Sequence, residues 1–131
     1  MSNPANQIEV HTPVDAGQVL QVPLLPALIN ISASIAGNGS VVSDVIIANG
    51  YKAFAFGCTS SQNGTVSIQR YLDQAGTILQ GAALTVSLTG GTAAILNNSD
   101  NHPFQSMVIT VSNSSGSAAT LTNTLLLLQS N

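Results

Sequence analysis

Charged residues are the scarcest class in this sequence. The 131 residues include two Lys or Arg and five Asp or Glu, so 5% of the chain is charged, against about 25% in an average soluble protein. A nucleic-acid site needs several cations on one face, and Lys52 and Arg70 alone cannot form one. We therefore expect no nucleic-acid partner. So little charge repulsion between copies suits a protein that works within an assembly.

Cysteine, long apolar runs and a secretion signal are also missing or nearly so. The single cysteine, Cys58, cannot form a disulfide within the chain. The longest apolar run, residues 125–128, is far shorter than the roughly 18 residues of a membrane helix, so we expect no membrane span. The first residues, MSNPANQIEVHTP, lack the basic start and apolar core of a signal peptide. This predicts synthesis in the cytoplasm without a signal peptide.

The residues that usually carry catalysis are few. No segment has the G-x-S-x-G pattern of a nucleophilic serine, and neither His11 nor His102 has an obvious acidic partner in the sequence. Asp100 and His102 offer two metal ligands from one loop, whereas protein metal sites normally need three or four. Cys58 lies in an apolar strand pattern, where a buried, inert thiol is expected. We therefore predict a protein that is not an enzyme and binds no metal or cofactor.

Short stretches of alternating apolar and polar residues fill the chain from residue 29 onward. In residues 84–89, for example, Leu84, Val86 and Leu88 alternate with hydroxyl residues, which is typical of a half-buried strand. Turn residues separate these stretches, and none has a convincing helical period. The strands predicted in this way are residues 29–35, 41–48, 51–59, 65–72, 77–80, 84–89, 93–96, 104–112 and 118–128. Their number and spacing predict an all-β protein, an antiparallel β-sandwich that is jelly-roll-like and has about eight strands.

Turn signals within residues 41–73 suggest how the strands pair. Asn49-Gly50 separates two apolar runs, and Asn-Gly suits the two positive-φ positions of a type I′ hairpin turn. We therefore expect a hairpin there, and a second reversal of the same meander at Asn63-Gly64. Residues 85–96 and 110–121 share the pattern TVS followed by AA-x-L, so both are predicted to be strand–turn–strand hairpins. Duplication of a hairpin and chance likeness within a Ser/Thr/Ala/Gly-rich chain both remain open.

Residues 1–28 differ in composition from the remainder, since four of the five prolines lie there. Proline disfavours a central strand and extends the residue before it. We therefore divide the chain into an extended, proline-containing N-terminal arm, residues 1–28, and a β-sandwich domain, residues 29–131. The arm packs either along its own sandwich or on a neighbouring subunit. Its apolar side chains are candidate interface residues: Val19, Leu20, Val22, Leu24 and Leu25.

Arg70 breaks the strand pattern, because it shares the inward parity of Val66 and Ile68. A buried guanidinium needs a carboxylate or several carbonyls, so we expect a structural ion pair with Asp44 or Asp73. A role in a subunit interface is the second interpretation, since arginine is enriched at interfaces.

The style of the whole sequence suggests a family. An apolar, proline-bearing arm precedes Ser/Thr/Asn/Gly-rich strands such as GTVSIQRYLDQAGT and FQSMVITVSNSSGSAATLTN. This resembles the small all-β virion proteins of bacteriophages, of the capsid decoration (cement) or minor capsid type. The resemblance implies a non-enzymatic structural protein, located in the virion, that forms a homo-oligomer, with a trimer favoured. It would bind the major capsid protein or another virion protein.

The alternative function is sugar binding, as a carbohydrate-binding module or the receptor-binding tip of a phage fibre. Sugar rings usually stack on exposed aromatic side chains, and the sequence has no Trp, three Phe and two Tyr. Tyr51 and Tyr71 are the residues we expect to form a sugar platform under this interpretation.

Overall fold

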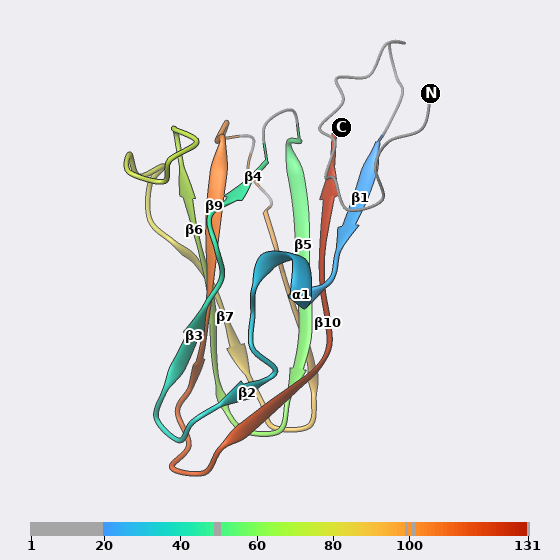
Figure 1. Ribbon diagram of the computed structural model, residues 1–131, viewed down its shortest axis with the longest axis vertical. Helices are drawn as coiled ribbons and strands as arrows, with labels where there is room; N and C mark the ends of the chain where they lie inside the picture. Colours follow the sequence, from blue (N-terminus) through green and yellow to red (C-terminus); the bar gives the residue numbers. More distant parts are fainter. Residues whose placement is uncertain (1–19, 49–50, 99, 101, 131) are drawn as a thin grey trace.

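The computed structural model of the chain describes residues 20–48, 51–98, 100 and 102–130, and these residues form a β-sandwich (Figure 1). One short helix, α1 (Pro26–Ile29), precedes most of the strands. The strands are β1 (Gln21–Leu24), β2 (Ser34–Ile35), β3 (Ser40–Val42), β4 (Ile46–Ile47), β5 (Ala53–Ser60), β6 (Gly64–Tyr71), β7 (Leu84–Leu88), β8 (Ala93–Asn97), β9 (Ser106–Asn113) and β10 (Ala119–Gln129). In these residues no helix has the length and apolar character needed to cross a membrane.

The strands form two antiparallel sheets that face each other. Sheet 1 has the order β1–β10–β5–β8, with β2 also paired to β10, and sheet 2 has the order β3–β9–β6–β7, with β4 also paired to β9. Since β1 and β2 share one neighbour, and β3 and β4 share another, the sandwich has eight strand positions. From β5 to β10 the chain passes repeatedly between the sheets, as in a jelly roll. The predicted fold class is confirmed.

The hairpin predicted at Asn49-Gly50 is wrong. Residues 49 and 50 lie outside the described part of the chain, and the amide of Tyr51 donates to the carbonyl of Ala48 at 2.9 Å across them. The flanking strands, however, belong to different sheets, because β4 pairs with β9 while β5 pairs with β10 and β8. The reversal at Asn63-Gly64 also leads from sheet 1 to sheet 2. The turn signals therefore mark sheet-crossing corners and not a meander.

The two similar segments are corners of the same kind. Residues 85–96 contain the passage from β7 in sheet 2 to β8 in sheet 1, and residues 110–121 contain the passage from β9 in sheet 2 to β10 in sheet 1. Neither segment is a hairpin, since β7 pairs with β6 and β9 pairs with β6 and β3. The two segments are therefore alike in sequence, and each connects a strand of sheet 2 to a strand of sheet 1.

The strand predicted over residues 29–35 begins with a helical turn. Pro26 stands at the start of α1, where its fixed φ suits the first helical turn. Asn30 ends the helix with a left-handed φ of 59°, which asparagine tolerates. The alternating residues Ile29, Ile31 and Ile35 are nevertheless buried. The pattern therefore predicted the burial of these three isoleucines, whereas Ala33 on the same parity is exposed and strand geometry is confined to β2.

The described part of the predicted arm, residues 20–28, packs on its own sandwich. Strand β1 lies antiparallel to β10, with Gln21 opposite Gln129 and Leu24 opposite Leu126. Pro23 occurs in this edge strand, where a missing N–H need not interrupt the sheet. Leu24 is 1% exposed. Residues 20–28 therefore pack along their own sandwich, which is one of the two arrangements expected for the arm, while residues 1–19 lie outside those described.

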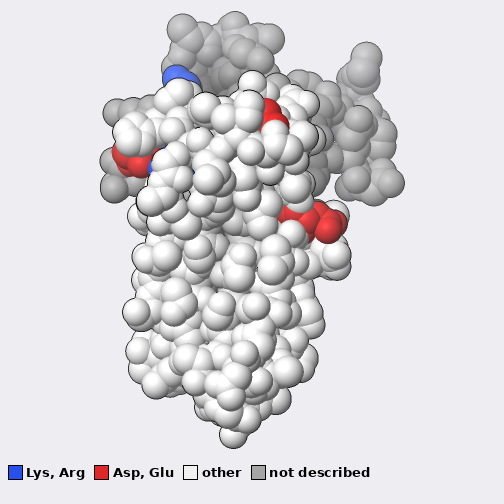
Figure 2. Space-filling view, turned by 90° about the vertical axis from the view of Figure 1, so that its left-hand side faces the viewer, with Lys and Arg blue, Asp and Glu red and all other residues white. Residues whose placement is uncertain are grey.

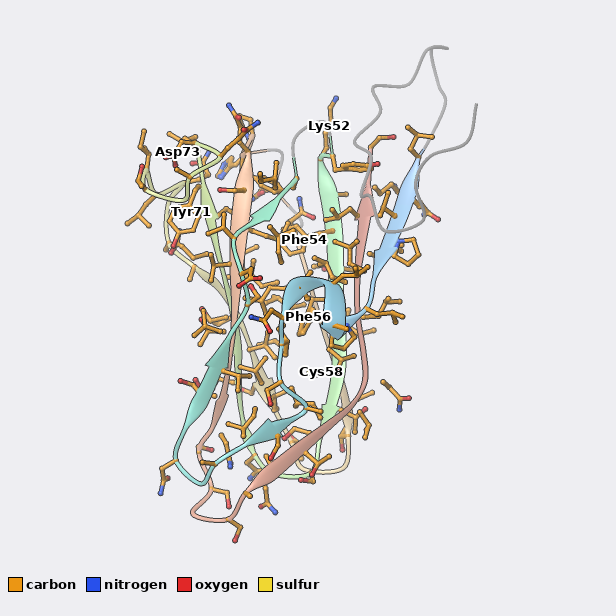
Figure 3. All side chains as sticks on the ribbon, viewed as in Figure 1. Lys52, Phe54, Phe56, Cys58, Tyr71 and Asp73 are labelled. Carbon is orange, nitrogen blue, oxygen red and sulfur yellow. The ribbon has the colours of Figure 1, made fainter. Side chains whose placement is uncertain are left out.

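The core fills the space between the sheets. On β5, Phe54, Phe56 and Cys58 alternate with smaller residues and are buried between the sheets (Figure 3). Side chains from both sheets complete the core, among them Ile68, Met107, Ile109, Val111, Leu126 and Leu128. Burying each large aliphatic or aromatic side chain contributes roughly 1.5–3 kcal/mol. This core fixes the loops at the two ends of the sandwich.

Candidate functional site

In the described residues, charged side chains lie toward one end of the sandwich. Figure 2 shows them in the upper half of the molecule, whereas the lower half of this face has none. The opposite end consists of the corner segments at residues 36–39, 61–63, 89–92 and 114–118, which contain no charged residue. We call this end the charge-free end.

The charged end contains a buried ion pair between Arg70 and Asp100. Arg70 Nη1 donates to Asp100 Oδ1 at 2.7 Å, and Nη2 donates to Oδ2 at 2.8 Å. The side chain of Arg70 is 3% exposed and that of Asp100 is 28% exposed. The guanidinium also lies over the ring of Phe104, 5.6 Å from its centroid. Two parallel hydrogen bonds of this kind give both strength and a fixed geometry.

The ion pair predicted for Arg70 is therefore present, but both predicted partners were wrong. Asp44 accepts a hydrogen bond from Asn30 Nδ2 at 3.4 Å, and Asp73 accepts hydrogen bonds from the amides of Thr77 and Ile78, each at 2.9 Å. The Thr77 hydroxyl also donates to Asp73, and these hydrogen bonds lower the pKa of Asp73 to about 2. Asp73 therefore stabilises its own loop.

Burial of Arg70 also bears on its predicted interface role. A side chain that is 3% exposed presents no donor to another subunit in this arrangement. One atom, Nε, is buried and has no hydrogen-bond partner, which is costly for a charged group. The guanidinium instead joins β6 to the loop that contains Asp100 and Phe104.

His102 lies beside the ion pair. Its Nδ1 is 3.4 Å from Asp100 Oδ2, so this histidine does have an acidic neighbour, contrary to the expectation from the sequence. The carboxylate is already bound to Arg70. In the described residues, no group of three or more His, Cys, Asp or Glu side chains could hold a metal ion. Cys58 is buried in the core, and burial raises the pKa of its thiol.

The predicted sugar platform is not formed as expected. Tyr51 is 4% exposed, and burial raises the pKa of its hydroxyl. Its ring therefore cannot stack on a sugar, and this prediction is wrong. Tyr71 is half-buried at the end of β6, in sheet 2. Tyr51 lies just before the start of β5, in sheet 1. The two tyrosines do not form one exposed surface.

The predicted interface residues of the arm separate into two groups. Leu20 exchanges hydrogen bonds with Ser130, donating to its Oγ at 2.8 Å and accepting from its amide at 2.9 Å. Leu20 and Val22 pack against the core, and Leu24 belongs to it. These three side chains are therefore not available to a neighbour. Leu25 is 61% exposed, and Val19 lies outside the described residues.

An apolar groove lies beside α1 and β4, close to Leu25. It has a volume of about 340 Å³. Two of its lining residues, Leu28 and Ile47, are 53% and 47% exposed. The lining consists of Leu24, Leu28, Ile29, Asp44, Val45, Ile46 and Ile47. The run Val45-Ile46-Ile47 was the sequence signal for this surface, because consecutive apolar residues in a strand point to both faces.

A polar hollow lies at the charge-free end. It has a volume of about 290 Å³ and is lined by Ser61, Gln62, Asn63, Gly90, Ser114 and Ser115. Asn63 holds two corners together, since its Oδ1 accepts from the amide of Gly90 at 2.8 Å and its carbonyl accepts from the amide of Ser114 at 3.0 Å. No single stretch of sequence predicts this hollow, because three separate corners form it.

Comparison with known proteins assigns no family. No family model and no curated protein matches this chain. Among solved structures, it is similar to a family 16 carbohydrate-binding module, with 12% identity, a TM-score of 0.43 and coverage of 71% of this chain and 73% of that one. A carbohydrate-binding module, CBM36, in complex with calcium and xylotriose gives 14% identity, a TM-score of 0.40 and coverage of 73% and 77%.

A third similar structure covers nearly the whole chain. It comes from a study described as "Bacillus endospore appendages form a novel family of disulfide-linked pili", with 14% identity, a TM-score of 0.41 and coverage of 98% of this chain and 95% of that one. At such TM-scores these likenesses carry no argument about function. The function proposed below therefore rests on the chain's own surfaces.

Proposed function

We propose that this protein is a non-enzymatic structural subunit that works by packing against other proteins, and that its particle is a virion. One observation carries the proposal: ten large aliphatic side chains of the described residues remain exposed. They are Leu25, Leu28, Val42, Val45, Ile47, Leu72, Ile78, Leu79, Ile95 and Leu125. Single exposed apolar residues are ordinary, but Leu28, Val45 and Ile47 line one groove, and grouped apolar side chains mark protein interfaces.

Light scattering after size-exclusion chromatography tests the proposal. We expect a mass of at least twice the 13.3 kDa chain mass, because exposed aliphatic side chains gain free energy when a neighbour covers them. We also expect mass spectrometry to detect the chain in particles purified by density gradient from the cells that make it. A chain that stays monomeric at micromolar concentration and is absent from such particles contradicts the proposal.

A second candidate function is the binding of a neutral carbohydrate in the polar hollow. Two features of the hollow support a sugar-binding site: its lining offers hydroxyl and amide groups, and the corner segments at that end contain no charged residue. Such groups can exchange hydrogen bonds with sugar hydroxyls. This candidate does not require the tyrosine platform.

Replacing Gln62 tests the carbohydrate candidate, since Gln62 lines the hollow. If a glycan array identifies a ligand, Gln62→Ala should weaken its binding about tenfold, the effect of losing roughly 1.4 kcal/mol of hydrogen bonding. Gln21→Ala, in the exposed edge strand β1, is the matched control and should bind like the unmodified protein. An array with no ligand, or equal losses in both variants, rejects this function.

A further inference from the structure

The outer faces of the two sheets differ sharply in composition. On sheet 2, the register aligns hydroxyl residues across three strands: Thr65 with Ser87 and Ser112, and Ser67 with Thr85 and Thr110. This face is the one presented in Figure 2. Hydroxyl side chains at an outer face can hydrogen-bond to water, so sheet 2 has the ordinary surface of a solvated sandwich.

The outer face of sheet 1 is mainly apolar. One row across the sheet consists of Leu125, Gly57 and Ile95, and the next contains Pro23, Leu127 and Ala55. Ile95 is 64% exposed and Leu125 is 37% exposed. We call these six residues the sheet 1 face. Around them lie uncharged polar residues, namely Gln21, Thr59, Asn97, Thr122 and Gln129. An apolar centre with a polar rim is the anatomy of a protein interface.

Gly57 gives a second, independent observation about this face. Glycine weakens the interior of a strand, and it often marks a place where another backbone or a ligand approaches closely. A Cβ atom built at Gly57 would lie 3.7 Å from the Ala94 carbonyl oxygen and 3.8 Å from Ile95 Cγ1, which is ordinary contact. Nothing within the described residues therefore requires glycine here. The small size of Gly57 leaves room for the close approach of a covering surface.

We propose that a second copy of this chain covers the sheet 1 face, so that sheet 1 of one copy packs against sheet 1 of the other. The inference rests on the proposed structural function and names the surface that serves it. Together with its polar rim, the face spans four strands, or about 19 Å, and at most the eight residues of β5, or about 27 Å. That is at most roughly 500 Å² per copy and about 1,000 Å² for two, which is the lower limit for a specific interface.

Charge favours a second copy over a charged partner. No residue of the sheet 1 face or of its rim is charged, so two copies can meet without removing a charge from water. A partner with a charged surface would lose hydration there and find no opposite charge. The amide side chains of Gln21, Asn97 and Gln129 can donate to and accept from the same residues of a facing copy.

Substitution of Ile95 tests this inference. Ile95→Lys places a charge in the centre of the face, and we expect the dissociation constant of the assembly, measured by sedimentation equilibrium, to rise at least about tenfold. The matched control is Val42→Lys, because Val42 is 53% exposed and lies on the outer face of sheet 2. We expect the control to associate like the unmodified protein. Circular dichroism checks that both variants fold.

A second variant keeps the test informative if Ile95→Lys does not fold. Gly57→Ala adds one methyl group that the fold accommodates, and it should weaken association while leaving the unfolding midpoint nearly unchanged. If the unmodified protein assembles but neither variant at the sheet 1 face weakens it, the inference is overturned and the structural function stands. If the unmodified protein is monomeric at every concentration, the inference fails, and detection of the chain in purified particles then decides the structural function.

Discussion

Replacing Asp100 by alanine is expected to lower the free energy of unfolding by about 3 kcal/mol. The substitution leaves the Arg70 guanidinium, whose side chain is 3% exposed, without its carboxylate. Removing one partner of a buried ion pair lowers stability by much more than the pair contributes in net terms, because an uncompensated charge stays in the core. The ring of Phe104, 5.6 Å from the guanidinium carbon, offsets part of this cost. Urea unfolding followed by circular dichroism measures the change.

The matched control is Arg70→Met, which removes the buried charge and leaves Asp100 28% exposed to water. We expect a loss of about 1 kcal/mol or less, since methionine can fill the site beside Met107 and Phe104 with apolar contacts. The double variant Arg70→Met/Asp100→Ala should be more stable than Asp100→Ala alone. Equal destabilisation by the two single substitutions would contradict a role for the unpaired buried charge.

Acid unfolding gives a second readout of the same ion pair. Hydrogen bonds from Arg70, opposed by desolvation, set the pKa of Asp100 to about 2. The unfolded chain has an ordinary aspartate pKa of about 3.9, so it takes up the proton first as the pH falls. The stability that Asp100 contributes is therefore complete above about pH 4 and is lost as the pH falls toward 2. Asp73 titrates in the same range, so Arg70→Met should reduce this loss without abolishing it.

Arg70 shows which features of a side chain strand periodicity can predict and which it cannot. Its parity with Val66 and Ile68 predicted an inward side chain, and all three are buried. The partner could not be predicted in the same way, because Asp100 lies in a loop between strands of opposite sheets. Periodicity describes the residues within a strand, whereas the position of a loop depends on how the sheets come together.

The turn residues show a similar limit, because they predict where the chain reverses but not which strands pair. Gly91, within the predicted strand–turn–strand segment 85–96, has a left-handed φ of 79°, so this predicted turn does contain a residue that reverses the chain. Reversal is a local property of φ and ψ. A hairpin and a corner between sheets both need a chain reversal, and only long-range packing decides which of the two forms. For this reason the sequence predicted a sandwich and most of its strands, but not the pairing of β4 with β9 or of β5 with β10.

The sheet 1 face could have been inferred from one strand. In AFAFGCTS, residues 53–60, the larger side chains share the inward parity, while the outward positions are Ala53, Ala55, Gly57 and Thr59. Small apolar residues at outward positions are unusual for a strand that faces water. The neighbours Leu125 and Ile95, however, come from β10 and β8, and only the register brings them beside Gly57.

Replacing Gly64 by alanine is expected to be as damaging as losing the ion pair. A Cβ atom at this position would lie 1.9 Å from the carbonyl oxygen of Ser112 and 3.0 Å from its carbonyl carbon. Both atoms are backbone, so no side-chain rotation relieves the overlap, and β6 must separate from β9 at its first residue. Gly64 also pairs with Asn113 and Leu88. We expect the free energy of unfolding to fall by about 3 kcal/mol, the upper range for overpacking, as measured by urea unfolding.

Gly116→Ala is the matched control at the same end of the molecule. Its nearest atom to a built Cβ is Asn38 Nδ2 at 4.0 Å, and Gly116 is not among the described residues with positive φ. Alanine there restricts the unfolded chain without straining the folded one, so a change within about 1 kcal/mol in the stabilising direction is expected. If Gly64→Ala were no worse than Gly116→Ala, the close approach of β6 to β9 would not be what requires glycine. The Asn63-Gly64 signal would then be a turn preference alone, as the sequence first indicated.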